Sequence, residues 1–187
     1  MKLIKKTIFI FVTLAARYAL AGDFSVEIDP SAYAFSGYAG HVRYHLGAGW
    51  ELSAGTYAMK MPSALKPMFL KSNTEDTDIK IKSAYAFFID KYLSEKSEGY
   101  FIGLEIGRQS YQVENLNLSQ QAESYDANLF MPRFGYKYIL GSSGLYVLPW
   151  VGVGYLQLSQ DSINLGAHKT ELKNILPFAT IHLGYNF

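Results

Sequence analysis

The sequence predicts an all-β fold, an eight-stranded antiparallel up-and-down transmembrane β-barrel. Apolar and polar residues alternate along the carboxyl end, and the same alternation recurs upstream in paired segments. The composition agrees, because the chain has 15 Tyr and 12 Phe but only 18% charged residues. A chain with one lipid-facing surface and a half-polar interior has this balance.

The amino end is expected to be a secretory signal peptide, residues 1–21. Three lysines precede an apolar run at residues 7–16, which is too short to span a bilayer as a helix. Ala-Leu-Ala then predicts cleavage before Gly22, whereas a retained anchor would need a longer run. The outer-membrane barrel domain would be residues 22–187. Its net charge is −3, because the signal removes four of the 17 basic residues and none of the 16 acidic ones.

The charge and cysteine content exclude several classes of function. A weakly acidic chain without a basic stripe gives no reason to expect nucleic acid as a partner. Because the chain has no cysteine, disulfides, a lipid-anchored amino-terminal Cys and thiolate sites are excluded. No cofactor is expected.

The first strand is predicted from Phe24 to about Pro30, although Asp29-Pro30 could instead begin a short helix. This strand is needed because seven others can be counted, and single-chain bacterial barrels have an even number. It would rise from the periplasm and close the barrel against the last strand.

Three hairpins follow, each with a short connection. Their strands are residues 33–46 and 50–61, residues 79–93 and 100–116, and residues 127–140 and 145–158. Longer polar stretches separate the hairpins, at residues 62–78, 117–126 and 159–173. Short turns on one side and longer loops on the other are typical of bacterial barrels, with the short turns in the periplasm.

Residues 138–160 leave a helical alternative open, because this stretch carries no charge and could cross a bilayer as a helix. Its four glycines and one proline favour a hairpin. Pro132, Pro149 and Pro177 are a difficulty for the barrel. Proline has no backbone N–H to donate, and a closed sheet has no free edge where that donor would not be needed. Local bulges are expected to accommodate them.

The last strand has an apolar or aromatic residue at every second position and ends on Phe187. Side chains alternate between the faces of a strand, so one face would meet lipid and the other the lumen. The proposed assembly signal is Ile181, Leu183, Tyr185 and Phe187.

With the strands placed, residues 149–155 and 177–187 resemble the small outer-membrane β-barrel superfamily that includes the OmpX, OmpW and OmpA-barrel types. Within it they are most similar to a group of uncharacterised proteobacterial barrel proteins. The resemblance implies a monomer in the outer membrane of a Gram-negative cell envelope. Its partners would be outer-membrane lipid, lipopolysaccharide and the barrel-assembly machinery. No activity is implied.

Parity along the strands predicts which polar residues line the lumen. The inward set is His41, Arg43, His45, Glu51, Ser53, Asp90, Glu105, Gln109, Arg133, Lys137 and His182. Among them, Arg43, Arg133 and Lys137 would form ion pairs with Glu51, Asp90 and Glu105, beside His41 and His182. Buried charges need such partners, and an eight-stranded barrel is barely wide enough to be filled by its own side chains.

Four functions stay open. A filled, ion-paired lumen favours a structural or surface-interaction protein, not an enzyme. Binding or passage of small hydrophobic molecules is the OmpW-like alternative, for which Met61, Leu65, Met68, Phe69 and Leu70 could rim a mouth. A lipid-A-modifying enzyme would need His182 or His41 beside Glu105 and a nucleophile, Ser53 or Ser110. A metal site at His41 and His45 lacks a second pair of ligands.

Outward aromatic residues near the short turns are expected to form a girdle at the membrane interface. The candidates are Trp50, Tyr92, Tyr100 and Tyr185.

Overall fold

The computed structural model describes residues 24–71, 75–116, 122–165 and 168–187. The predicted signal peptide lies outside the described residues. Among the described residues, none of the helices is both long and apolar enough to cross a bilayer.

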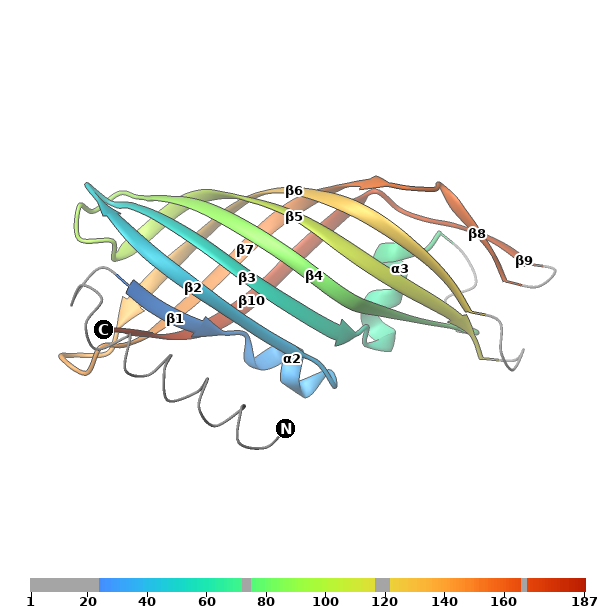
Figure 1. Cartoon of the computed structure of the whole chain (residues 1–187), viewed down its shortest axis with the longest axis horizontal. Coiled ribbons are helices and arrows are strands. Elements are labelled where there is room, and N and C mark those ends of the chain that lie inside the picture. Colours follow the sequence, from blue (N-terminus) through green and yellow to red (C-terminus); the bar gives the residue numbers. More distant parts are fainter. Residues whose placement is uncertain (1–23, 72–74, 117–121, 166–167) are drawn as a thin grey trace, which may run out of the picture.

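Eight antiparallel strands close into a ring, which we call the barrel (Figure 1). Their order around the ring is β1-β10-β7-β6-β5-β4-β3-β2, and β8 and β9 form a separate hairpin. The all-β, eight-stranded prediction is therefore confirmed for the part of the chain that the structure describes. The bounds are β1 (Phe24–Ile28), β2 (Tyr38–Gly47), β3 (Trp50–Lys60), β4 (Thr77–Tyr92), β5 (Gly99–Asn115), β6 (Ala122–Ile139), β7 (Leu145–Leu158), β8 (Ser162–Leu165), β9 (His168–Glu171) and β10 (Ile175–Asn186).

The three short turns lie at the same end of the barrel as the start of β1 and the end of β10 (Figure 1). We call this the short-turn end. The tightest of these turns is Gly47-Ala48-Gly49, in which all three residues have positive φ. Glycine adopts such φ values without strain, so the sequence dictates the reversal at this position. The opposite end carries α3 (Lys66–Phe69) and the β8–β9 hairpin, and we call it the long-loop end.

The segment after β1 is a helix, α2 (Pro30–Ala34), so the second strand begins at Tyr38 and not at residue 33 as predicted. The helical alternative at Asp29-Pro30 was correct. The Asp29 side chain accepts a hydrogen bond from the Ser31 backbone N–H at 2.8 Å, and proline is favoured in the first turn of a helix.

Helix α2 completes the barrel wall where β1 is too short. β1 reaches only Leu183 of β10, and beyond that point β10 has no strand partner on this side among the described residues. α2 instead contacts β2, β3 and β10. The Thr180 hydroxyl donates to Asp29 Oδ2 at 2.8 Å, and the Lys60 N–H donates to the Phe35 carbonyl at 2.9 Å. The helix thus joins both edges of the interrupted sheet.

The prediction of bulges at the three prolines was wrong. Register shifts occur at His45/Gly47, Tyr57/Met59 and Ile81/Ser83, away from any proline. Between β6 and β7 the register is the same on both sides of Pro132 and Pro149, although the residues beside these prolines are not paired. The missing donors therefore interrupt the ladder without displacing it. Residues 138–160 belong to β6, a turn and β7, so the helical alternative for them was also wrong.

The long connections contain more structure than polar loops would. The first includes a 3-10 turn (Ser63–Leu65) and α3, and the last contains the β8–β9 hairpin. Lys71, just after α3, holds the hairpin through a hydrogen bond from its Nζ to Glu171 Oε2 at 2.9 Å. That contact keeps the pKa of Glu171 below its usual value.

Candidate functional site

A charged network crosses the lumen at the short-turn end. Arg43 is its centre: Nε donates to Glu27 at 2.9 Å, and Nη1 donates to Glu51 at 2.8 Å and to Asp90 at 2.6 Å. Arg43 is only 1% exposed, and the three carboxylates come from β1, β3 and β4. A buried guanidinium is stable here because each of its nitrogens meets a carboxylate.

Two cations from β6 complete this network. Arg133 forms an ion pair with Asp90, and Lys137 Nζ lies 3.0 Å from Glu51 Oε1. Since β6 is three places from β3 around the ring, the Lys137–Glu51 pair bridges the lumen. We call the set Glu27, Arg43, Glu51, Asp90, Arg133 and Lys137 the charged plug.

His182 lies above the plug with both ring nitrogens engaged. Trp150 Nε1 donates to its Nε2 at 3.2 Å, so Nδ1 carries the proton and donates to Glu27 Oε2 at 3.1 Å. The ring also stacks on His41, with centroids 4.9 Å apart. His182 is therefore a fixed neutral link between the plug and the aromatic residues above it.

Gly103 makes room for part of the plug. It lies directly opposite Asp90 on the neighbouring strand, and a Cβ at Gly103 would overlap Asp90 Oδ1. The absence of a side chain on β5 lets the carboxylate fold flat across the strand toward Arg43 and Arg133.

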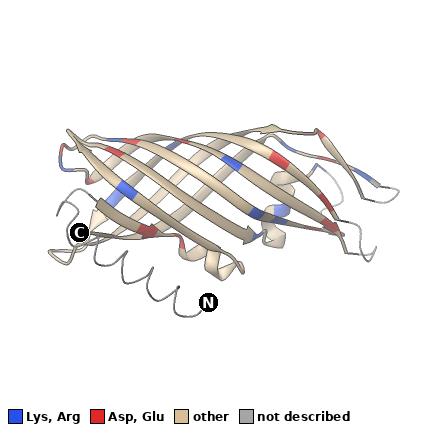
Figure 2. Ribbon diagram, viewed as in Figure 1, with Lys and Arg blue, Asp and Glu red and all other residues tan. Residues whose placement is uncertain are grey.

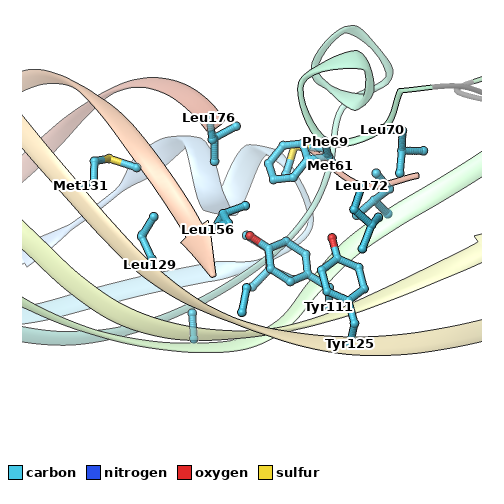
Figure 3. Close-up of a cluster of buried hydrophobic side chains, with 14 of the residues drawn as sticks. Met61, Phe69, Leu70, Tyr111, Tyr125, Leu129, Met131, Leu156, Leu172 and Leu176 are labelled. Carbon is cyan, nitrogen blue, oxygen red and sulfur yellow. The ribbon is translucent and has the colours of Figure 1, made fainter. Parts of the chain in front are cut away.

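The long-loop half of the lumen is apolar (Figure 3). Phe69 of α3 packs toward Met61 and Tyr111, and side chains of β6, β7 and β10 project into the same space. The Tyr111 and Tyr125 rings are stacked, with centroids 4.7 Å apart. The buried side chains here include Met61, Phe69, Leu70, Tyr111, Tyr125, Leu129, Met131, Leu156, Leu172 and Leu176.

A cavity of about 1130 Å³ occupies this region, and we call its lumenal part the chamber. Outward side chains such as Leu104 and Val151 also border the cavity, so only part of its volume lies in the lumen. Inside, Leu129, Met131 and Phe69 are among the apolar walls. The polar boundary toward the plug consists of His41, Glu105, Gln109, Arg133 and His182.

Glu105 differs from the expectation that it would pair with a plug cation. Its side chain is 3% exposed and borders the chamber, but its carboxylate makes no hydrogen bond or ion pair with another described residue. Its neighbours across the strands are Phe88 and Met131, and the nearby Gln109 is hydrogen-bonded to Tyr57 and Tyr111. The other predicted ion-pair residues do contact one another. Arg43, Glu51, Asp90, Arg133 and Lys137 lie in the plug, His182 donates to Glu27, and His41 only stacks on His182.

The serine–histidine pairs considered for acyl transfer do not meet among the described residues. Ser110 faces away from the histidines and donates to Asp126 Oδ1 at 2.6 Å. The Ser53 hydroxyl has no hydrogen-bond partner, and His182 is occupied by Trp150 and Glu27.

His41 and His45 do not converge on a metal site. His45 Nδ1 lies 2.6 Å from Glu51 Oε1 in the plug, while His41 stacks on His182. The ligand atoms of Glu27, His41 and His182 do lie within 4.8 Å of one another. However, the Glu27 oxygens accept from Arg43, Tyr146 and His182, and the proton on His182 Nδ1 points at Glu27. Hydrogen bonding accounts for this cluster without an ion.

The sequence reasoning missed one plug residue, Glu27, and its hydrogen-bond donor Tyr146, and it misplaced the side chain of Tyr92. Glu27 lies in the strand that was hardest to assign, yet the alternation of residues 24–28 points it inward. Tyr146 donates to Glu27 Oε1 at 2.8 Å. Tyr92 was assigned to the outward girdle, but it is fully buried, because it shares the parity of Asp90. Trp50, Tyr100 and Tyr185 do face outward.

No protein-family model, curated protein or solved structure matches this chain. The described residues form a closed eight-stranded barrel with a charged plug at one end of its lumen and an apolar chamber at the other.

Proposed function

We propose that this chain is an outer-membrane β-barrel protein that binds a small hydrophobic molecule in its chamber and is closed to passage by its charged plug. The observation that carries the proposal is the division of the lumen into an ion-paired half and an apolar half with free volume. Ligand sites are concave and mostly apolar, with a few placed polar groups, which describes the chamber.

The exterior of the barrel supports the membrane location. Every outward residue of β6 between residues 130 and 138, and of β7 between residues 145 and 155, is apolar, Tyr or Pro. These lengths match the 9–11 residues of a membrane-crossing strand. Toward the long-loop end the surface changes to the exposed ion pair Arg108–Asp126. On the ribbon, charged positions are few and most lie toward the strand ends (Figure 2).

The plug supports a barrel that does not conduct. Its side chains come from β1, β2, β3, β4 and β6, so the contacts cross the lumen from one wall to the other. Opening a path would leave charges unpaired away from water, which is costly. This argues against passage through the short-turn end and leaves binding as the favoured role.

The location can be tested at Phe187, whose backbone N–H donates to the Phe24 carbonyl at 3.1 Å and so joins the carboxyl end to the start of β1. Deleting Phe187 is expected to reduce outer-membrane insertion, measured by cell fractionation and a heat-modifiability gel. Phe187→Tyr, which keeps an aromatic carboxyl end, should insert normally. Recovery of the native protein outside the membrane fraction would contradict the proposed location.

Ligand binding can be followed at Trp150, which borders the chamber and is 4% exposed. The chain has two tryptophans, so Trp50→Phe leaves Trp150 as the single reporter. We expect 1-bromodecane to quench Trp150 saturably. Leu129→Phe, which adds volume at the chamber wall, should weaken this effect, while Leu52→Phe on the outer surface should not. The Trp150→Phe variant keeps only the outward Trp50 and is the control. If 1-bromodecane quenches Trp150 in Trp50→Phe no differently from Trp50 in Trp150→Phe, the chamber is not a binding site.

A further inference from the structure

We propose that the chamber selects an apolar amine, whose ammonium group pairs with Glu105. This inference rests on the proposed function and names the class of ligand. It follows from the different surroundings of the buried carboxylates: three lie in the plug, Asp29 accepts hydrogen bonds from Ser31 and Thr180, and Glu105 has no such partner among the described residues.

Three of these carboxylates have their charge balanced within the plug. Glu27, Glu51 and Asp90 face Arg43, Arg133 and Lys137 in one connected set of contacts. Three anions and three cations leave no positive charge over, and the hydrogen bonds use both oxygens of each carboxylate.

Glu105 is a further buried carboxyl group and has no cationic partner among the described residues. Arg133 directs Nε and Nη2 at Asp90, and its buried Nη1 has no hydrogen-bond partner among the described residues. Its guanidinium lies over the rings of Phe88, Phe101 and Trp150. A buried carboxylate without a partner is costly, so a donor entering from the chamber would be stabilised strongly.

The surroundings of Glu105 suit a donor with an apolar body. Met131 and Phe88 flank the carboxylate across the strands, and His41 borders the same cavity with a buried Nδ1 that has no hydrogen-bond partner in the described part of the chain. An ammonium can donate to Glu105 while its chain lies among the apolar walls. A carboxylate head would repel Glu105, and an alcohol would supply a donor without the charge.

The test compares dodecylamine, dodecanol and dodecanoate on the Trp50→Phe protein in detergent, using Trp150 emission, with and without Glu105→Gln. Comparing each ligand on both variants cancels its partition into the micelle. We expect Glu105→Gln to weaken dodecylamine binding about tenfold or more and to change dodecanol binding by no more than about twofold. Dodecanoate should bind the variant better than the parent. Glu95→Gln, on an exposed turn, is the matched control.

The outcomes separate the two proposals. If none of the three ligands affects Trp150 saturably, the hydrophobic-ligand function is wrong. If they bind but Glu105→Gln weakens all three equally, or leaves the amine unaffected, the function stands and the amine preference is wrong. Unfolding in urea shows whether Glu105→Gln is folded, so that a loss of binding is not a loss of structure.

Discussion

The two halves of the lumen solve the same packing problem in opposite ways. At the short-turn end, Arg43 and its partners fill the interior with charge, and nearly every donor finds an acceptor. At the long-loop end, apolar side chains line the wall and leave a cavity. Most of the strands run through both halves, so the difference comes from their inward positions and from α3, which adds Phe69 to the apolar half.

In the proposed function, one half of the lumen stabilises the barrel and the other half binds the ligand. Buried charges hold a unique geometry only while all of them are present, which makes the plug rigid and intolerant of change. Apolar walls around free volume tolerate rearrangement, so a ligand can enter without breaking hydrogen bonds. Glu105 lies at the boundary between the two halves. It is as buried as the carboxylates of the plug, but it has no hydrogen-bond or ion-pair partner among the described residues.

The largest expected effect is at the centre of the plug. Arg43→Met leaves Glu27, Glu51 and Asp90 without their shared cation and should lower the free energy of unfolding by about 3–5 kcal/mol. Arg108→Met, which breaks the exposed pair with Asp126, should cost no more than about 1 kcal/mol. Urea unfolding of both variants in detergent measures the difference.

A milder change keeps this prediction testable if Arg43→Met does not fold. Tyr146→Phe removes one donor to Glu27 and should cost about 1.5–3 kcal/mol, between the two arginine variants. Equal losses for Arg43 and Arg108 would mean that the plug contributes no more than a surface ion pair, and the contrast between the halves would fail.

Much of the barrel could be predicted from the sequence because alternation and turn length are local signals. The short turns follow from the lengths of the connections, the closing first strand from the even number of strands, and the inward direction of Arg43, Asp90 and Lys137 from parity. The start of β2 could not be placed in this way, because the Asp29 cap and Pro30 favour a helix in a segment that also alternates.

The partners within the lumen were harder to predict than the residues that face it. Parity predicts that both Glu105 and Asp90 face the lumen. It does not predict which of the two lies level with Arg133 along the barrel axis. The choice of Arg133 for Asp90 depends on the room opened by Gly103, a contact between neighbouring strands. The chamber likewise depends on α3 folding back over the strands, which no periodicity indicates.

A smaller effect is expected at Gly103, and it tests whether the geometry of the plug matters as well as its charge. In Gly103→Ala the new Cβ displaces Asp90 from Arg43 and Arg133, so we expect a loss of about 1–3 kcal/mol. Gly40→Ala on β2 is the matched control, because a Cβ there meets nothing within 4 Å. Alanine also suits a strand better than glycine, so Gly40→Ala should be neutral or stabilising by up to about 1 kcal/mol.

A double-mutant cycle identifies the cause of the Gly103 effect. If the damage arises through Asp90, then adding Gly103→Ala to Asp90→Ala should cost much less than it does alone, because the displaced carboxylate is already gone. Full additivity of the two losses would mean that Gly103 acts through the strand backbone. In that case the close fit of Asp90 over Gly103 would not be what sets the plug geometry, and room for the carboxylate would have to come from elsewhere in the wall.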